Sequence, residues 1–142
     1  VGHEYWRTYF QVLRDCLKPG GYACLQSITL REDLFARYLH STDFIQQFIF
    51  PGGLLPSVTA FEQEAQRAGL TVEKKMRFGK DYAETLRRWR QAFEQRLDEV
   101  RSLGFDERFV RIWRFYLAYC EAAFDTGNTD VVQFTLRRPD HA

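Results

Sequence analysis

The sequence has no long apolar run and almost no net charge. No apolar stretch approaches the roughly eighteen residues of a membrane-spanning helix, and the chain does not open with a signal-peptide pattern. The cytoplasm is therefore the expected compartment. Twenty basic side chains against nineteen acidic ones leave a net charge of +1. This balance gives no electrostatic case for nucleic acid and only a local one for anionic lipid.

Cysteine and histidine are too few and too scattered for a disulfide framework or a metal site. Cys16, Cys24 and Cys120 are odd in number, lie far apart and form no C-x-x-C motif. We expect reduced, buried thiols. The three histidines show none of the spacings to carboxylates that metal sites use, so no metal is expected.

A glycine-rich nucleotide loop is also missing. No G-x-G-x-x-G occurs in the sequence, and the glycine pairs at 20–21 and 52–53 lack the strand-loop-helix context of a phosphate cradle. We therefore expect no residue of this chain to bind a nucleotide cofactor.

The most distinctive stretch that is present is the apolar loop at residues 48–57, FIFPGGLLPS. Two prolines and two glycines prevent both helix and strand from continuing through it. Loops normally run over the surface and are polar. An apolar loop therefore either plugs a core or lines an apolar pocket, and the ten residues alone favour neither reading.

The 142 residues, 45% of them hydrophobic, predict one α/β domain spanning 1–142, with about three strands and several long helices. Helices are expected at 1–18, at 31–50 with a break near 40–43, from Ser57 to Gly69, at 81–103 and at 105–124. Strands are expected at 22–29, 71–77 and 131–136. Ser41 or Thr42, and Ser57, are the expected N-caps, and Gly69 and Gly104 the expected stops.

The three strands are few for this much helix. The first strand carries little charge, which is typical of a strand covered on both faces, and it has no obvious neighbour on one side. The second strand is polar enough to lie at or near an edge. We therefore expect more sheet than these residues supply.

Several blocks of the sequence match one family pattern. They are Tyr9-Phe10 with LKPGG at 17–21, LQSI at 25–28, the apolar loop, FGKDY at 78–82 with Trp89, and YLAYCE at 116–121. The chain resembles cyclopropane-fatty-acyl-phospholipid synthases, which are S-adenosylmethionine-dependent methyltransferases. The resemblance implies the C-terminal half of a Rossmann-like class I methyltransferase fold. The Gly-rich cofactor-binding half would lie upstream of Val1, so the chain alone is expected to be inactive.

The resemblance also implies a reaction, the transfer of a methylene group to the cis double bond of an unsaturated phospholipid acyl chain. A bound bicarbonate would serve as the base. Tyr82 matches the tyrosine whose hydroxyl holds this anion, Ile28 the residue that offers its backbone N–H, and Gln26 a position that is often histidine. Without the resemblance, Gln26 would be an ordinary strand residue and Tyr82 an aromatic residue at the start of a helix.

The acyl chain is expected to meet the apolar loop and the last long helix, where aromatic faces can stabilise a passing cation. The expected substrate-binding residues are Phe48, Phe50, Pro51, Gly52, Leu54, Tyr116 and Tyr119. The expected partners are an unsaturated phospholipid, the inner face of the membrane as a peripheral contact, and a second copy in a homodimer. Two alternatives stay open, a non-catalytic lipid-binding or dimerisation module, and a relative that methylates the acyl chain without closing the ring.

Overall fold

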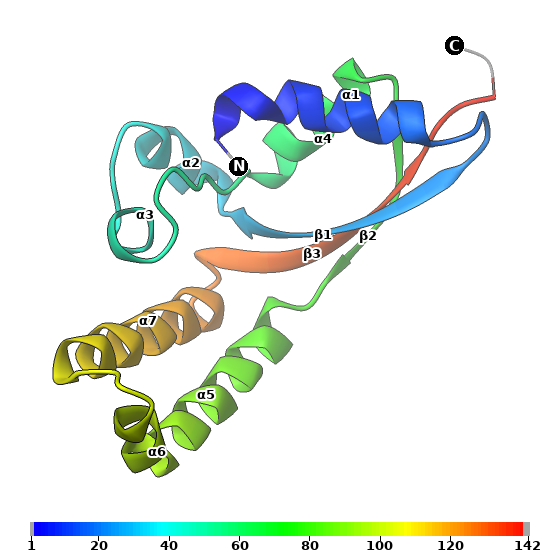
Figure 1. Ribbon diagram of the computed structural model, residues 1–142. Helices are drawn as coiled ribbons and strands as arrows, with labels where there is room; N and C mark the ends of the chain where they lie inside the picture. Colours follow the sequence, from blue (N-terminus) through cyan, green and yellow to red (C-terminus); the bar gives the residue numbers. More distant parts are fainter. Residues whose placement is uncertain (1, 141–142) are drawn as a thin grey trace. The chain divides into compact units, whose positions relative to one another are not determined.

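The computed structural model describes residues 2–140, which divide into two compact units. We call residues 2–77 together with 130–140 the sheet unit, and residues 78–129 the helical unit (Figure 1). Each unit is described by itself, and the expectation of a single domain over 1–142 stays a prediction.

The sheet unit is built on three strands, as the sequence predicts. These are β1 (Tyr22–Leu30), β2 (Thr71–Arg77) and β3 (Thr129–Arg137), in the order β1-β3-β2. β2 pairs antiparallel with β3 from Thr71↔Arg137 to Arg77↔Val132. β2 is therefore an edge strand, which confirms the expectation from its polar sequence. β1 forms the other edge.

Two helices cover one face of this sheet (Figure 1). They are α1 (Trp6–Cys16), which follows a short 3-10 turn at His3–Tyr5, and α4 (Val58–Arg67). The Ser57 hydroxyl caps α4 by accepting a hydrogen bond of 3.1 Å from the Ala60 N–H. Gly69, with a φ of +77°, follows the end of α4. Both ends of this helix are as predicted.

The hydrophobic core lies between these helices and β3. The Phe61 ring stacks on Phe134 with centroids 3.8 Å apart, and Phe10 meets Phe61 edge-on at 4.9 Å. The buried members of the core are Phe10, Phe61, Ala65, Ala68, Leu70, Val132, Phe134 and Leu136. The last strand thus holds residues from both ends of the sequence together.

The second helical region breaks where predicted, into α2 (Glu32–Leu39) and α3 (Phe44–Phe48). The predicted caps, Ser41 and Thr42, are wrong, because Asp43 is the N-cap. Its carboxylate accepts from the Gln46 N–H at 2.8 Å, and the Gln46 amide oxygen accepts from the Asp43 N–H at 3.0 Å. Only Asp43 has a glutamine three residues later, which the reciprocal capping box requires.

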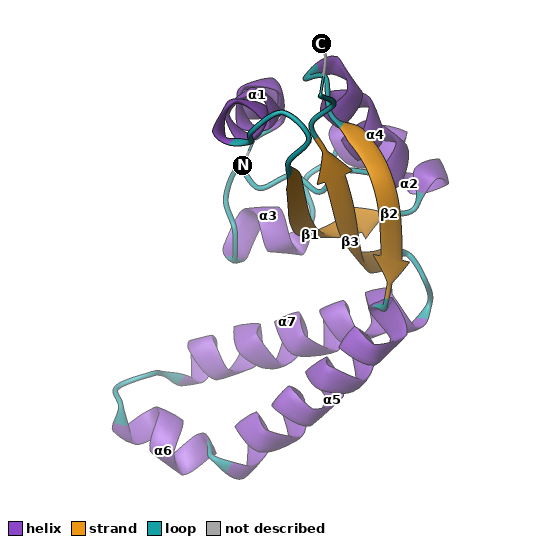
Figure 2. Cartoon of the chain, turned by 90° about the vertical axis from the view of Figure 1, so that its right-hand side faces the viewer, coloured by secondary structure: helices purple, strands orange, loops and turns teal. Residues whose placement is uncertain are grey.

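The helical unit consists of α5 (Gly79–Gln95), α6 (Leu97–Ser102) and α7 (Glu107–Asp125). α5 and α7 lie side by side (Figure 2). The predicted continuous helix at 81–103 is wrong, because Arg96 leaves the helical region with φ −118° and ψ 22°. α7 begins after Asp106, whose carboxylate accepts from the Phe109 N–H at 2.8 Å. Within residues 2–140, no helix is long and apolar enough to cross a membrane.

Two further expectations about burial are corrected. The cysteines are reduced, but Cys16 and Cys24 are exposed and Cys120 is half-buried. β1 is not covered on both faces, since its side chains alternate between exposed and partly buried along most of its length. An uncharged strand reads as buried from its sequence, although Tyr22 is 61% exposed.

The stacked phenylalanines predict where the sheet unit is most sensitive. Phe134→Ala removes a ring from a fully buried site, so we expect a loss of about 3–5 kcal/mol in the free energy of unfolding. Urea denaturation followed by circular dichroism measures it. Met76→Ala on β2, where the side chain is 48% exposed, is the matched control and should cost less than about 1 kcal/mol. Equal losses in both variants would contradict this view of the core.

Candidate functional site

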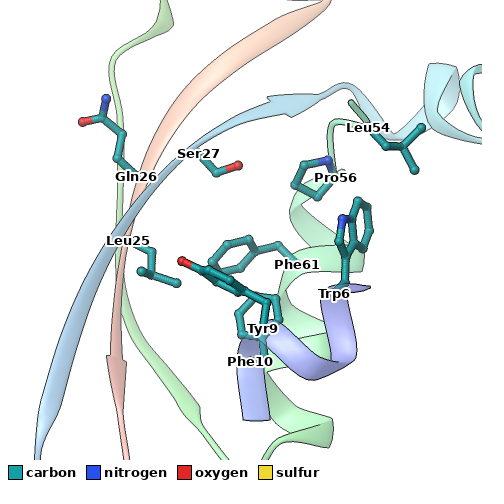
Figure 3. A pocket seen from close by; sticks show the side chains of 9 residues that line it. All are labelled: Trp6, Tyr9, Phe10, Leu25, Gln26, Ser27, Leu54, Pro56 and Phe61. Atoms are coloured by element: carbon teal, nitrogen blue, oxygen red, sulfur yellow. The ribbon is translucent and has the colours of Figure 1, made fainter. Parts of the chain in front are cut away.

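An apolar pocket of about 180 Å³ lies in the sheet unit, between α1, α4, β1 and the end of the apolar loop (Figure 3). Its lining is Trp6, Tyr9, Phe10, Leu25, Gln26, Ser27, Leu54, Pro56 and Phe61. No charged side chain is among them. Such a pocket suits an apolar ligand, because a charge buried there would find no partner.

Sequence reasoning identified only Leu54 and Gln26 of this lining. Trp6, Phe10 and Phe61 carry a signal in their helical spacing, but that spacing indicates core as readily as pocket. The Gln26 side chain points away from the cavity (Figure 3), and its amide oxygen accepts from Gln133 Nε2 at 3.1 Å. The N–H groups of the Gln26 amide are thus left to donate on that side of β1.

The apolar loop is ordered by polar contacts at three points. Gln46 Nε2 donates to the Gly53 carbonyl at 3.1 Å, and the Leu55 N–H donates to the Tyr38 hydroxyl at 3.4 Å. The Leu30 N–H donates to the Pro56 carbonyl at 2.8 Å. Burial raises the pKa of Tyr38, so this phenol stays neutral. The loop is therefore fixed to α2, α3 and β1.

Only one part of the apolar loop lines the pocket. Leu54 and Pro56 line the pocket, whereas Phe48 and Phe50 are 49% and 58% exposed. Pro51 and Gly52 form the exposed turn between these two parts, and Gly52 has a φ of +75°. Of the predicted substrate-binding residues in the loop, only Leu54 reaches the cavity.

A second cluster of predicted residues lies within the helical unit. The Tyr82 ring on α5 meets Phe124 edge-on at 5.2 Å and Trp89 at 6.2 Å. On α7, Tyr116 lies close to Tyr82, and its side chain forms a hydrogen bond with Cys120. Burial, with these two neighbours, raises the pKa of Tyr116 to about 12. Its hydroxyl is therefore protonated at ordinary pH and can donate a hydrogen bond.

The structure brings Tyr82 and Tyr116 together but not Tyr119. Tyr119 is three residues beyond Tyr116, yet it is 38% exposed and its ring stacks with Phe115 at 5.8 Å. Gln26 and Ile28 belong to β1 of the sheet unit, and Tyr82 to the helical unit. The anion site that would combine them stays a prediction.

A network of ion pairs joins α5 and α7. The Glu121 carboxylate, 13% exposed, accepts from Arg87 Nε and from Arg90 Nε, each at 3.0 Å. Arg87 also reaches Asp125 at 3.0 Å. Glu121 follows Cys120 in the chain, so the network fixes the part of α7 that carries the Tyr116 cluster. No sequence motif predicted these pairs, since the charged stripe of α5 reads as a solvated face.

Comparison with known proteins gives one family. The family model described as "Mycolic acid cyclopropane synthetase" matches residues 1–134. "Tuberculostearic acid methyltransferase UfaA1" of Mycobacterium tuberculosis is 45% identical over 139 residues, which is 97% of this chain and 33% of that protein. "Cyclopropane mycolic acid synthase 3" of the same organism is 32% identical over 146 residues, covering 96% of this chain and 50% of that protein.

Solved structures agree with the sequence comparison. The crystal structure of "mycolic acid cyclopropane synthase CmaA1 complexed with SAH and CTAB" superposes with a TM-score of 0.85 at 30% identity. The alignment covers 96% of this chain and 50% of that one. The chain thus spans between a third and a half of the length of these relatives.

The ion-pair network makes Glu121 the most sensitive charged residue of the helical unit. Glu121→Gln weakens the bonds to two arginines, so we expect a loss of about 1–3 kcal/mol in unfolding free energy. Urea denaturation measures this loss. The control is Glu94→Gln, which breaks the more exposed pair with Arg114 and should cost less than about 1 kcal/mol. A smaller loss at Glu121 than at Glu94 would show that the network does not hold the two helices together.

Proposed function

Because the chain belongs to the mycolic acid cyclopropane synthetase family, we propose that it is the acyl-binding part of an S-adenosylmethionine-dependent lipid methyltransferase. The observation that carries this proposal is the uncharged apolar pocket beside the ordered loop. A fatty acyl chain offers only apolar surface, so burial is the main free energy that it can gain. The fold is correspondingly the C-terminal part of a Rossmann-like methyltransferase domain.

The cosubstrate does not fit the residues of this chain. Gly20 and Gly52 have positive φ values, but Gly20 leads into β1 and Gly52 lies in an exposed turn. Neither opens a helix after a strand, as a phosphate cradle would. We therefore assign S-adenosylmethionine to the remainder of a complete protein, where it would supply the methyl group.

The proposed reaction transfers the sulfonium methyl to one carbon of a cis double bond, leaving positive charge on the other carbon. A proton then leaves the new methyl group, and the ring closes. Bicarbonate, as the proposed base, would take this proton. The Tyr82 hydroxyl, the Ile28 backbone N–H and the free N–H groups of Gln26 would hold the anion. Among the described residues, the Tyr82 hydroxyl makes no hydrogen bond, so it is free for such a role.

The substrate and the product are also proposals. We propose an unsaturated phospholipid acyl chain as the substrate and a cyclopropane as the product. The 45% identity to a protein named tuberculostearic acid methyltransferase favours a second candidate, a methyl-branched acyl chain without a ring. Mass spectrometry of lipids treated with the complete protein separates the two. A third possibility is a lipid-binding module without catalytic activity. In that case the complete protein would transfer no methyl group to lipid.

We further propose that the protein acts in the cytoplasm at the inner face of the membrane, where its lipid substrate lies. A peripheral position needs no spanning helix.

Tyr82 tests the mechanism. In the complete protein, Tyr82→Phe keeps the aromatic contacts with Phe124 and Trp89 but removes one donor from the anion. We expect kcat to fall about a hundredfold or more while lipid binding is kept. Tyr5→Phe, which alters an exposed phenol elsewhere, is the control. Unchanged turnover in Tyr82→Phe would remove Tyr82 from the site.

We propose that the 142-residue chain forms a homodimer through β1. Among residues 2–140, no strand pairs with the outer edge of β1 in the sheet, and an open edge promotes association. Tyr22→Lys with Cys24→Lys should reduce the dimer fraction, because edge lysines oppose pairing. Met76→Lys on β2 is the control. Sedimentation velocity at micromolar concentration measures the dimer, and a monomeric parent chain would contradict the proposal.

A further inference from the structure

α7 has an exposed face in addition to the one it buries. Val110, Leu117 and Phe124 are buried, and Leu86 of α5 is buried as well. A different side of α7 carries Arg108, Arg111, Phe115 and Tyr119, which we call the outer face. Their spacings of three and four residues place them along one side of the helix. All four are exposed, and Phe115 is 51% exposed.

The two arginines of the outer face differ from most others in the helical unit. Arg87, Arg90 and Arg114 are each paired with a carboxylate. Arg108 and Arg111 form no ion pair with any residue that the structure describes. Glu107, four residues before Arg111 on the same helix, is near enough for Arg111 to help lower its pKa. The outer face therefore combines two arginines that form no ion pair with two stacked aromatic rings, one of which ends in a hydroxyl.

We propose that the outer face of α7 docks on the surface of a phospholipid bilayer. Aromatic side chains prefer the level of the lipid headgroups, with their rings among the upper acyl carbons. Arginine side chains extend to the phosphates, whose negative charge complements the guanidinium groups. The inference rests on the proposed function, since a protein that modifies acyl chains of membrane lipids must meet a bilayer. It adds the surface through which it does so.

The direct test is the binding of the 142-residue chain to vesicles. Equal parts of dimyristoyl phosphatidylcholine and dimyristoyl phosphatidylglycerol give a surface with negative charge. We expect cosedimentation of the parent chain, and a partition coefficient at least about tenfold lower for the double variant Phe115→Ser with Tyr119→Ser. Tyr5→Ser, at a side chain that is 58% exposed in the sheet unit, is the matched control and should change it less than about twofold.

A second pair of variants tests the charges without touching the aromatic rings. Arg108→Glu with Arg111→Glu should lower the partition coefficient about tenfold or more, and added salt should weaken the parent in the same direction. The control is Arg88→Glu on α5, whose charge change is of the same kind and whose partner Glu84 is also exposed. Circular dichroism confirms that each variant is folded. If the serine variant unfolds, the arginine variant decides alone.

Three results would overturn the proposal. The parent chain could fail to bind these vesicles, the outer-face variants could bind as well as their controls, or the outer face could mediate a dimer that excludes vesicles. Sedimentation velocity of the same variants detects the last case. Because the chains of these lipids are saturated, no methyl transfer to them is possible. Vesicle binding can thus fail or succeed independently of the activity assay that tests the proposed function.

Discussion

The position of β3 in the middle of the sheet is the constraint on which the rest of the structure depends. The chain leaves the sheet after Arg77 and returns to it at Thr129, and these ends are held together by the Arg77↔Val132 pairing and the 3.2 Å ion pair between Arg77 and Asp130. The helical unit is therefore an insertion between β2 and β3, and its two ends join the sheet next to each other. Contacts between its own helices give this unit internal order. The packing of α5 on α7 and the Glu121 network supply that order.

Helix ends that are marked by a capping residue or a glycine could be predicted from the sequence. Ser57, Gly69 and Gly104 mark helix ends for local reasons, a side-chain acceptor in one case and a positive φ in the others. The end of α5 could not be predicted in this way. Arg96 is neither glycine nor proline, and the apolar spacing continues through Leu97 and Val100 beyond it. The sequence therefore carries no local signal for this break.

The candidate site was only partly predictable for a related reason. The family could be predicted from short sequence motifs, and the family match over residues 1–134 confirms it. The sequence did not predict that Tyr116 lies beside Tyr82 while Tyr119 is exposed. The spacing of apolar residues indicates which side chains share a helix face, but it does not indicate what covers that face. Phe10 and Phe61 show the same ambiguity in the sheet unit. They belong to the hydrophobic core and also line the pocket, so the description of each as a core residue is correct but incomplete.

The ion pairs of the helical unit and the aromatic cluster around Tyr82 and Tyr116 differ in a way that bears on the proposed chemistry. Charged groups of α5 and α7 pair with each other, whereas Tyr82 and Tyr116 contact aromatic rings and Cys120. A carboxylate placed among these rings would need its own partner. The phenol of Tyr116 avoids that cost, and it remains a donor because burial raises its pKa to about 12. On the proposed function, positive charge appears on the acyl chain only briefly. Ring faces can stabilise such a charge without forming an ion pair that must later be broken.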